Sequence, residues 1–257
     1  MIRHIVSVVL LVRNGFTGVP MPPGSVLVLL VDGRRCSVVR KPGGWLILTN
    51  LPEGKHELSL RCVGFHEEVL TVEVRSGAVW EQAVDLRPGP GYWFPPGTTH
   101  LTATVKTSAG RPAKGVELWA GKSGQTRVTV SQAKAEQREA QLFCRGPIVR
   151  LPVPGNFLFV GGSAPELVYL RKLRASGEAS LEKPLNADRK RGEELFPVRR
   201  FRTGEDGTAE LSFPGGGELW LYCEGQVRSV ALEKEREALE LVLEKKAQKT
   251  SKASKSK

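Results

Sequence analysis

The sequence has few of the residue patterns that chemistry requires. Its histidines show neither H-x-x-x-H nor H-E-x-x-H spacing, and its four cysteines form no C-x-x-C pair. A G-x-S-x-G elbow is missing, as are the glycine-rich motifs that cradle phosphates. From these absences we predict no catalytic residue, no metal site and no cofactor. The prediction is therefore a protein that is not an enzyme.

Long apolar runs are also missing. The apolar run Ile5–Val12 has eight residues, and no stretch approaches the ~18–20 that a helix needs to cross a bilayer. The residues that follow, Arg13-Asn14-Gly15, do not form the small-residue cleavage site of a signal peptide. We predict that Ile5–Val12 is a buried strand and that the protein is cytoplasmic.

Helical patterns are scarce, whereas turn formers are common. The 257 residues include 28 glycines and 17 prolines, and 40% of the residues are apolar. This length and composition favour β structure with many turns, in one large or two medium domains. Gln132–Leu142 is the one stretch predicted to form a short helix.

One phrase occurs twice. "ELSLRCVG" at Glu57–Gly64 and "ELWLYCEG" at Glu218–Gly225 share Glu, Leu, Leu, Cys and Gly at identical spacing. In each copy a strand and a Pro/Gly turn precede the phrase, so each is predicted to be a β-hairpin. If each copy belongs to its own domain, Cys62 and Cys223 lie in two separate cores as small buried hydrophobes.

Alternating apolar and polar residues flank both copies. The pattern predicts an all-β protein of two tandem antiparallel β-sandwiches, immunoglobulin-like or transthyretin-like in kind. The expected divisions are a first sandwich at 1–87, a rigid proline-rich connector at 88–98, a second sandwich at 99–246 and a disordered lysine-rich tail at 247–257. The second sandwich carries an insertion at about 121–202. Within it, Pro147–Val153 is predicted as a strand and Arg174–Phe201 as a long mobile loop.

A family resemblance supports this division. "GRPAKGVELW", "TGEDGTAEL" and "GELWLYCEG" resemble the carboxypeptidase regulatory-like domain, a transthyretin-like β-sandwich. The first copy departs from that family, because Pro42-Gly43-Gly44 stands where the family has Asp-Gly. The resemblance implies a non-catalytic structural module. The connector "LRPGPGYWFPPGTTHLTATV" also resembles segments of bacterial proteins associated with phage-tail-like contractile injection systems, which implies a subunit or adaptor of such an assembly.

The net charge of +11 is unevenly placed. The segment Lys245–Lys257 has six lysines and no acid, and Arg171–Arg202 has ten bases against five acids. The remainder of the chain is about neutral. The pI of 9.7 is therefore no sign that the whole surface is built for a polyanion.

Two groups of residues are predicted to contact partners. Bases beside Phe196 and Phe201 would bind an acidic surface of another protein subunit or, alternatively, a nucleic-acid backbone, with help from the lysine-rich tail. These bases are Arg189, Lys190, Arg191, Arg199, Arg200 and Arg202. Three connector aromatics are predicted to pack in the interdomain seam or to form a binding hot spot: Tyr92, Trp93 and Phe94. The sequence thus predicts a non-enzymatic structural protein that docks neighbours through sandwich edges, loops and a basic insert.

Overall fold

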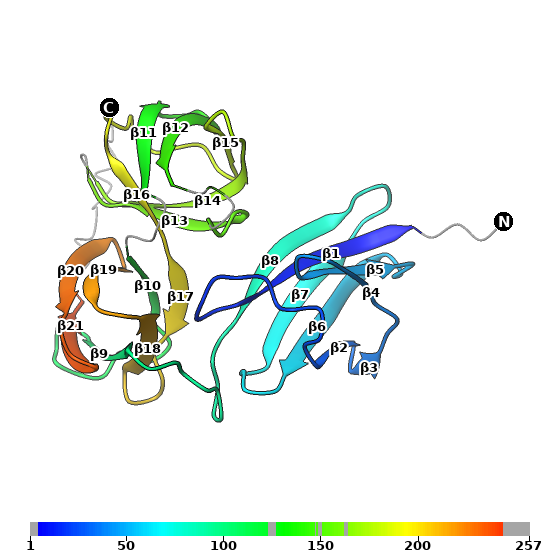
Figure 1. Cartoon of the computed structure of the whole chain (residues 1–257). Coiled ribbons are helices and arrows are strands. Elements are labelled where there is room, and N and C mark those ends of the chain that lie inside the picture. Colours follow the sequence, from blue (N-terminus) through cyan, green and yellow to red (C-terminus); the bar gives the residue numbers. More distant parts are fainter. Residues whose placement is uncertain (1–4, 123–126, 147, 149–150, 162–163, 244–257) are drawn as a thin grey trace, which may run out of the picture.

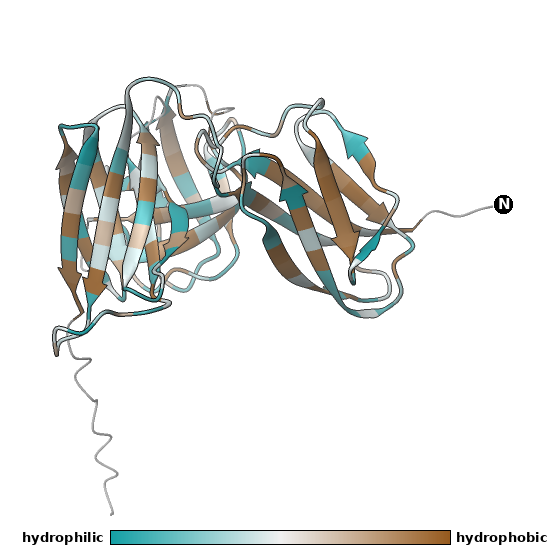
Figure 2. Cartoon of the chain, turned by 90° about the horizontal axis from the view of Figure 1, so that it is seen from below, coloured by the Kyte–Doolittle hydropathy of each residue, from teal (hydrophilic) through white to brown (hydrophobic). Residues whose placement is uncertain are grey.

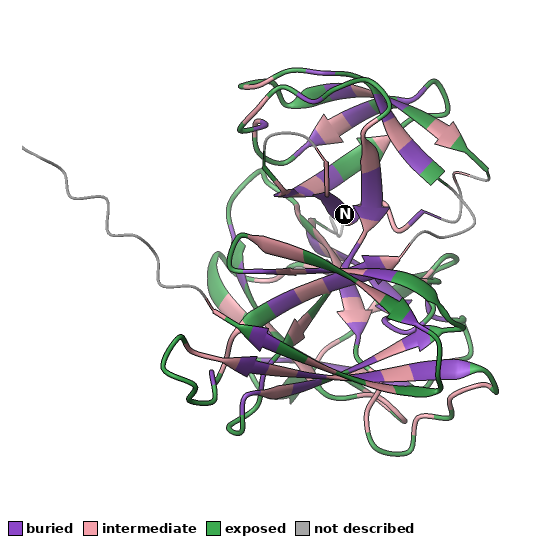
Figure 3. Cartoon of the chain, turned by 90° about the vertical axis from the view of Figure 1, so that its left-hand side faces the viewer, coloured by how far each residue is buried: buried purple, intermediate pink, exposed green. Residues whose placement is uncertain are grey.

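The computed structural model describes residues 5–122, 127–146, 148, 151–161 and 164–243, and its regular elements are all β-strands (Figure 1). The strands form two sandwiches and one closed barrel. Apolar and polar residues alternate along most strands, and the buried positions follow the same alternation (Figures 2 and 3). The chain is therefore all-β, as the alternation in the sequence predicts.

The first sandwich has two four-stranded sheets. One has the order β4-β5-β1-β8 and the other β3-β2-β6-β7. Its strands are β1 (Val6–Asn14), β2 (Leu27–Val31), β3 (Arg34–Arg35), β4 (Val39–Lys41), β5 (Trp45–Thr49), β6 (Gly54–Cys62), β7 (Glu68–Val74) and β8 (Trp80–Leu86). Inward-facing leucines and valines of both sheets form its core, including Val8, Leu10, Leu48 and Leu58. Each sheet therefore buries one face against the other.

The second sandwich repeats this arrangement. Its sheets have the orders β18-β9-β21 and β17-β10-β19-β20. The strands are β9 (Thr98–Lys106), β10 (Glu117–Lys122), β17 (Arg199–Arg202), β18 (Thr208–Pro214), β19 (Gly217–Cys223), β20 (Gln226–Leu232) and β21 (Arg236–Val242). Leu101, Leu118, Leu211 and Phe213 belong to a separate core.

The two sandwiches share one topology. In both, the first strand pairs in parallel with the last, β1 with β8 and β9 with β21. Both place the repeated strand, β6 or β19, between its two antiparallel neighbours. Cys62 lies opposite Leu27 and Cys223 opposite Leu118, so the two thiols occupy equivalent places in two different cores. Both thiols are free.

The repeated phrase does not form a hairpin, which corrects the sequence prediction. β5 pairs with β1 and β4, whereas β6 pairs with β2 and β7. In the second copy β18 pairs with β9, and β19 with β10 and β20. The Pro/Gly turn thus carries the chain from one sheet to the other. Leucines of both strands then meet across the core, which stabilises this crossing. The parallel pairs are a second difference from the purely antiparallel sheets predicted.

A closed six-stranded barrel lies between β10 and β17. Its strand order is β11-β12-β15-β14-β13-β16. The bounds are β11 (Arg127–Ala133), β12 (Glu139–Arg145), β13 (Gly155–Phe159), β14 (Glu166–Leu173), β15 (Glu178–Leu181) and β16 (Glu194–Pro197). β17 pairs with β10 as β3 pairs with β2. In the first sandwich the turn Asp32-Gly33 joins that pair, and both residues have the positive φ of a two-residue hairpin loop. The barrel takes the place of this turn.

The barrel corrects three local predictions. The expected helix at Gln132–Leu142 is the end of β11 and the start of β12, with Ala133 and Ala140 buried. The expected mobile loop at Arg174–Phe201 contains β15, β16 and part of β17. β15, β16 and β17 are too short to show a clear alternation of apolar and polar residues. In the described part of Pro147–Val153 no strand is present. The predicted lysine-rich tail, 247–257, lies outside the described residues.

Candidate interdomain junction

The two sandwiches and the barrel meet at the ends of β1 and β8. We call the residues that join them the junction: Arg13, Asn14, Phe16, Asp85, Tyr92, Phe94 and Arg199. β1 and β8 run parallel in register, so Arg13 lies directly opposite Asp85. The strand ends position both side chains where the other two bodies approach.

Arg13 joins the first sandwich to the barrel. Its Nε donates to Asp85 Oδ1 at 2.6 Å, and its Nη2 donates to Asp85 Oδ2 at 3.0 Å. Its Nη1 donates to the backbone oxygen of Pro154, just before β13, at 2.9 Å. The Arg13 side chain is 4% exposed. A buried guanidinium with a bidentate carboxylate and a third acceptor is a well-satisfied charge.

Arg199 joins the second sandwich to the first. It begins β17, and its Nη1 donates to the backbone oxygens of Gly15 and Phe16, the latter at 3.0 Å. Its Nη2 donates to the backbone oxygen of Ser212 in β18, also at 3.0 Å. The guanidinium carbon lies 4.6 Å from the centre of the Phe213 ring. One cation thus satisfies carbonyl groups of both sandwiches.

Burial lowers the pKa of Arg199 to about 10, because the charged form loses hydration. Asp85 and Tyr92 act in the opposite direction. Even so the guanidinium stays charged near neutral pH. Its contacts are carbonyl oxygens and aromatic faces and not a paired carboxylate, so its position depends on the two sandwiches staying together.

Aromatic rings fill the seam beside these arginines. Tyr92 lies 5.8 Å from Phe16, 5.1 Å from Phe65 and 4.8 Å from Phe94, measured between ring centres. Phe94 in turn lies 4.9 Å from His100 of the second sandwich. The mostly edge-on geometry of these pairs is favourable for aromatic rings. The Asn14 amide donates to the Tyr92 hydroxyl at 2.9 Å, which fixes the ring against the end of β1.

The connector is held against the first sandwich. Gly89 N donates to Gly64 O at 2.9 Å, and Tyr92 N closes a turn by donating to Gly89 O at 3.0 Å. A Cβ atom at Gly89 would lie 2.8 Å from His66 N, so this close approach requires glycine. The connector is therefore a packed turn rather than the extended spacer that its prolines predict.

The predicted aromatic residues separate into two environments. Tyr92 and Phe94 lie half-buried in the seam, as just described. Trp93 points away and is 77% exposed. The three adjacent residues therefore do not act as one cluster.

The predicted basic group is divided as well. Arg189 is buried in the barrel, where its side chain is 1% exposed and pairs with Glu166 and Glu193. Its guanidinium also lies 4.6 Å from the Phe159 ring. Arg189 and Arg199 are thus internal, which corrects the prediction that they contact an outside partner. Their charges are needed inside the fold.

The remaining four bases lie at the surface. Arg200 pairs with Glu117 at 3.4 Å, and Arg202 Nε donates to the Gly115 oxygen at 3.1 Å. Lys190 and Arg191 are exposed. These four do not form one continuous basic strip with Arg189 and Arg199.

The sequence prediction missed Arg13 and Asp85, although a lone arginine directly after the apolar run Ile5–Val12 was a signal of a buried ion pair.

No family model matches the sequence, and no curated protein matches it. Solved structures give weak similarities. The TIE protein of Bacillus anthracis is 11% identical with a TM-score of 0.25, over 95% of this chain and 51% of that chain. This chain thus spans about half of that protein. GBS52, the minor pilin of Streptococcus agalactiae, is 10% identical with a TM-score of 0.24, over 92% and 94% of the two chains. A variant of BcpA, the major pilin subunit of Bacillus cereus, is 10% identical with a TM-score of 0.28, over 94% and 99%.

The described residues contain no group of three His, Cys, Asp or Glu side chains arranged to hold a metal ion. Within the same residues, no helix has the length and apolarity that crossing a membrane requires.

Proposed function

We propose that this chain is a non-enzymatic structural subunit of a larger protein assembly. Its role is geometric: it holds two β-sandwiches and a barrel in one fixed arrangement so that their outer edges meet neighbouring subunits. The observation that carries this proposal is the junction, where Arg199 and Arg13 join all three bodies through partly buried, charge-assisted hydrogen bonds. Such bonds are costly to break once buried.

Two features of the fold agree with this role. Both sandwiches leave sheet edges at their flanks, such as β7 in the first and β20 in the second. Unpaired strand edges can be extended by another chain. A second, more specific part of the proposal concerns which assembly this is. We propose a bacterial particle of the phage-tail-like contractile kind, built with regulatory-like β-sandwich modules and assembled in the cytoplasm.

The test is fractionation of the native host by size, with the chain detected by an affinity tag. The proposal predicts that the wild-type chain migrates in a high-mass fraction together with other proteins. Arg199→Met should leave that fraction, whereas the matched control Arg200→Met, at the exposed neighbouring position, should stay in it. A wild-type chain that migrates as a free monomer in every fraction would overturn the proposal.

A further inference from the structure

The first sandwich has one side where exposed bases lie at the edges of both sheets. β3 is an edge strand of one sheet and β4 an edge strand of the other, and three residues connect them. All five residues of these two strands are exposed. We call this the open side: Arg34, Arg35, Val39, Arg40 and Lys41. β3 lies toward the end of the first sandwich away from the second (Figure 1).

The open side is strongly basic. Four of its five residues are bases, and between Gly33 and Leu46 the sequence has no acid at all. The nearest acid before this segment, Asp32, already has a partner, because its Oδ2 lies 2.7 Å from His56 Nδ1. The ion pairs found among the described residues include none of these four bases. Uncompensated like charges on one surface favour an acidic partner.

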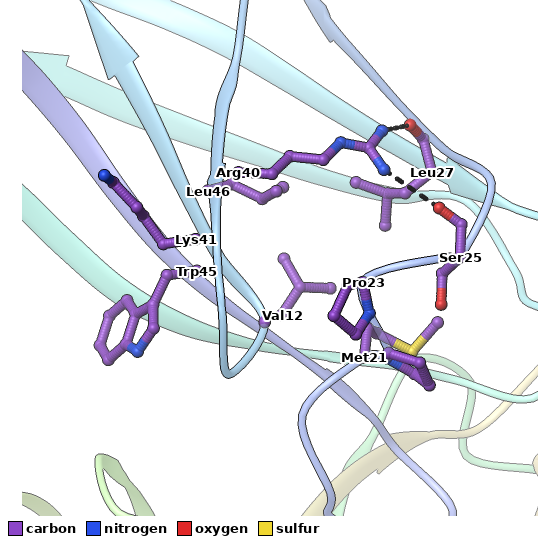
Figure 4. Close-up of a pocket in the computed structure, with 11 residues that line it drawn as sticks. Val12, Met21, Pro23, Ser25, Leu27, Arg40, Lys41, Trp45 and Leu46 are labelled. Atoms are coloured by element: carbon purple, nitrogen blue, oxygen red, sulfur yellow. Dashed lines mark hydrogen bonds between the residues drawn. The ribbon is translucent and has the colours of Figure 1, made fainter.

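A small apolar notch opens beside β4. It has a volume of about 30 Å³ and is lined by Val12, Met21, Pro23, Leu27, Trp45 and Leu46, with Arg40 among the residues around it (Figure 4). The Arg40 guanidinium donates to the backbone oxygens of Ser25 and Leu27 and so spans from β4 to the segment leading into β2. This space is about that of a single water-sized group. It fits the tip of an aliphatic side chain and is too small for a nucleobase.

The second sandwich already uses the equivalent edge for docking. β17 lies beside β10 where β3 lies beside β2. From that position Arg199 binds backbone oxygens of the first sandwich. The same edge in the first sandwich is free of such a contact among the described residues. The shared topology therefore marks the β3 edge, which carries Arg34 and Arg35 beside β4, as a place for contacts with another body.

We infer that the open side binds an extended, acidic segment of a partner protein, which pairs with the free edge of β4 and inserts an aliphatic side chain into the notch. Carboxylates of that segment would lie opposite Arg34, Arg35 and Lys41. Strand addition supplies main-chain hydrogen bonds, and the notch and the charges supply specificity. The most exposed aromatic side chains of the described residues, Trp93 and Phe143, lie elsewhere, and beside the open side there is one half-buried ring, Trp45, rather than the series of exposed rings on which successive bases stack. This inference rests on the proposed function, because it names one partner surface of the assembly.

The test measures binding of a labelled short peptide of alternating glutamate and valine to the full chain by fluorescence anisotropy. A peptide of alternating lysine and valine and a short thymidine oligonucleotide serve as comparison probes. We expect the acidic peptide to bind most tightly, and added salt to weaken it. R34E/R35E should weaken it by at least about tenfold. K134E/R138E makes the same charge change at two exposed residues of the barrel region and should leave it unchanged.

Amide hydrogen exchange gives a second reading. Bound peptide should slow exchange in Val39–Lys41, because strand addition covers that edge. The inference would be overturned by equal binding of the acidic and basic peptides, by an equal loss of affinity in the two double variants, or by unchanged exchange in β4. Tighter binding of the oligonucleotide would replace the partner with a nucleic acid. Self-association of the wild type that R34E/R35E abolishes would replace it with a second copy. In each of these cases co-migration with a large particle would still stand as a separate result, so the two proposals fail separately.

Discussion

Arg199 of the second sandwich donates a hydrogen bond to the backbone oxygen of Phe16 in the first, across 183 residues of sequence. The same guanidinium donates to Ser212 within its own sandwich. The two sandwiches therefore share one half-buried cation. A change at this residue should affect how they hold together and not only how each one folds.

Replacing Arg199 by methionine tests that coupling. The substitution keeps much of the apolar contact with Phe213 but leaves the oxygens of Gly15, Phe16 and Ser212 without their donor. Buried acceptors without partners cost about 1–3 kcal/mol each, less where water can reach them. We expect Arg199→Met to lower the free energy of unfolding by about 2–4 kcal/mol in total. Urea denaturation followed by tryptophan fluorescence measures this. Arg200→Met, at an exposed site, should change the unfolding free energy by less than about 0.5 kcal/mol. Equal losses in the two variants would mean that the Arg199 contacts contribute nothing.

Asp85→Asn tests the ion pair that holds Arg13 in position against the barrel. The carboxylate is the acid that pairs with the nearly fully buried Arg13, so its loss leaves a buried guanidinium without a counter-charge. The Asp85 side chain is itself 33% exposed, which moderates the effect, and we expect a loss of about 1–3 kcal/mol. Thermal unfolding measures it. Glu73→Gln breaks the exposed pair with Arg75 and should be close to neutral. If the two variants lose the same stability, the buried pair is no stronger than a surface one.

His56 and Asp32 should give the first sandwich a pH-dependent stability. His56 Nδ1 contacts Asp32 at 2.7 Å and Nε2 contacts the Pro52 oxygen at 2.9 Å. The Pro52 oxygen can only accept, so the doubly protonated ring suits both partners. The hydrogen bond to Asp32 raises the pKa of His56, and the hydrogen bond from His56 lowers the pKa of Asp32.

The sign follows from linkage. The raised pKa of His56 adds stability that is complete below its unfolded value near 6.5 and is lost as pH rises through the folded pKa. The lowered pKa of Asp32 adds stability above 3.8 that is lost as pH falls through its folded pKa. The pair should therefore contribute most between about pH 4 and 6. Denaturation at a series of pH values measures this. His56→Gln should lower the free energy of unfolding most in that range and remove the fall in stability as pH rises above about 6.5. An unchanged profile in the variant would contradict the assignment.

The repeated cysteines should be poor nucleophiles. Burial raises the pKa of Cys223 to about 11 and also raises the pKa of Cys62. At pH 8 about 0.1% of Cys223 would be thiolate, and only the thiolate reacts rapidly. We expect alkylation of the native protein by iodoacetamide, followed by mass spectrometry, to modify Cys223 more slowly than the half-buried Cys36. Unfolding in urea should equalise the two rates. Fast modification of native Cys223 would contradict its burial.

Period-two alternation predicted most strands of both sandwiches, because each has one face in a core and one in water. It did not predict β17, which lies mostly in the expected loop Arg174–Phe201, or the short strands β3 and β4. The repeated Leu-x-Leu-x-Cys pattern also predicted two separate cores. Pairing was not predictable from the same pattern. A Pro/Gly turn between two apolar strands fits a hairpin and a crossing between sheets equally well, and only the leucines facing one another across the core decide between them.

Charge was the least reliable guide to the surface. Arg189 and Arg199 lie in one basic stretch with Lys190 and Arg200, yet Arg189 is buried and Arg199 half-buried, whereas the other two are exposed. Glu193 is only four residues from Arg189, but Glu166 comes from β14, and the carbonyl groups of Gly15 and Phe16 that Arg199 contacts follow β1. Burial of a charge depends on such distant partners, so local sequence does not show it. The bases of the open side were overlooked because they are spread over two short strands.

The central claim is that the junction holds the sandwiches in one fixed arrangement. Pulsed electron-spin distance measurement tests it most directly, with labels at the exposed residues Ser76 and Ser229 of a chain whose four cysteines are replaced by alanine. The account predicts a single narrow distance distribution for the otherwise unchanged chain and a broad one for Arg199→Met. A broad distribution already present with Arg199 in place would contradict the claim.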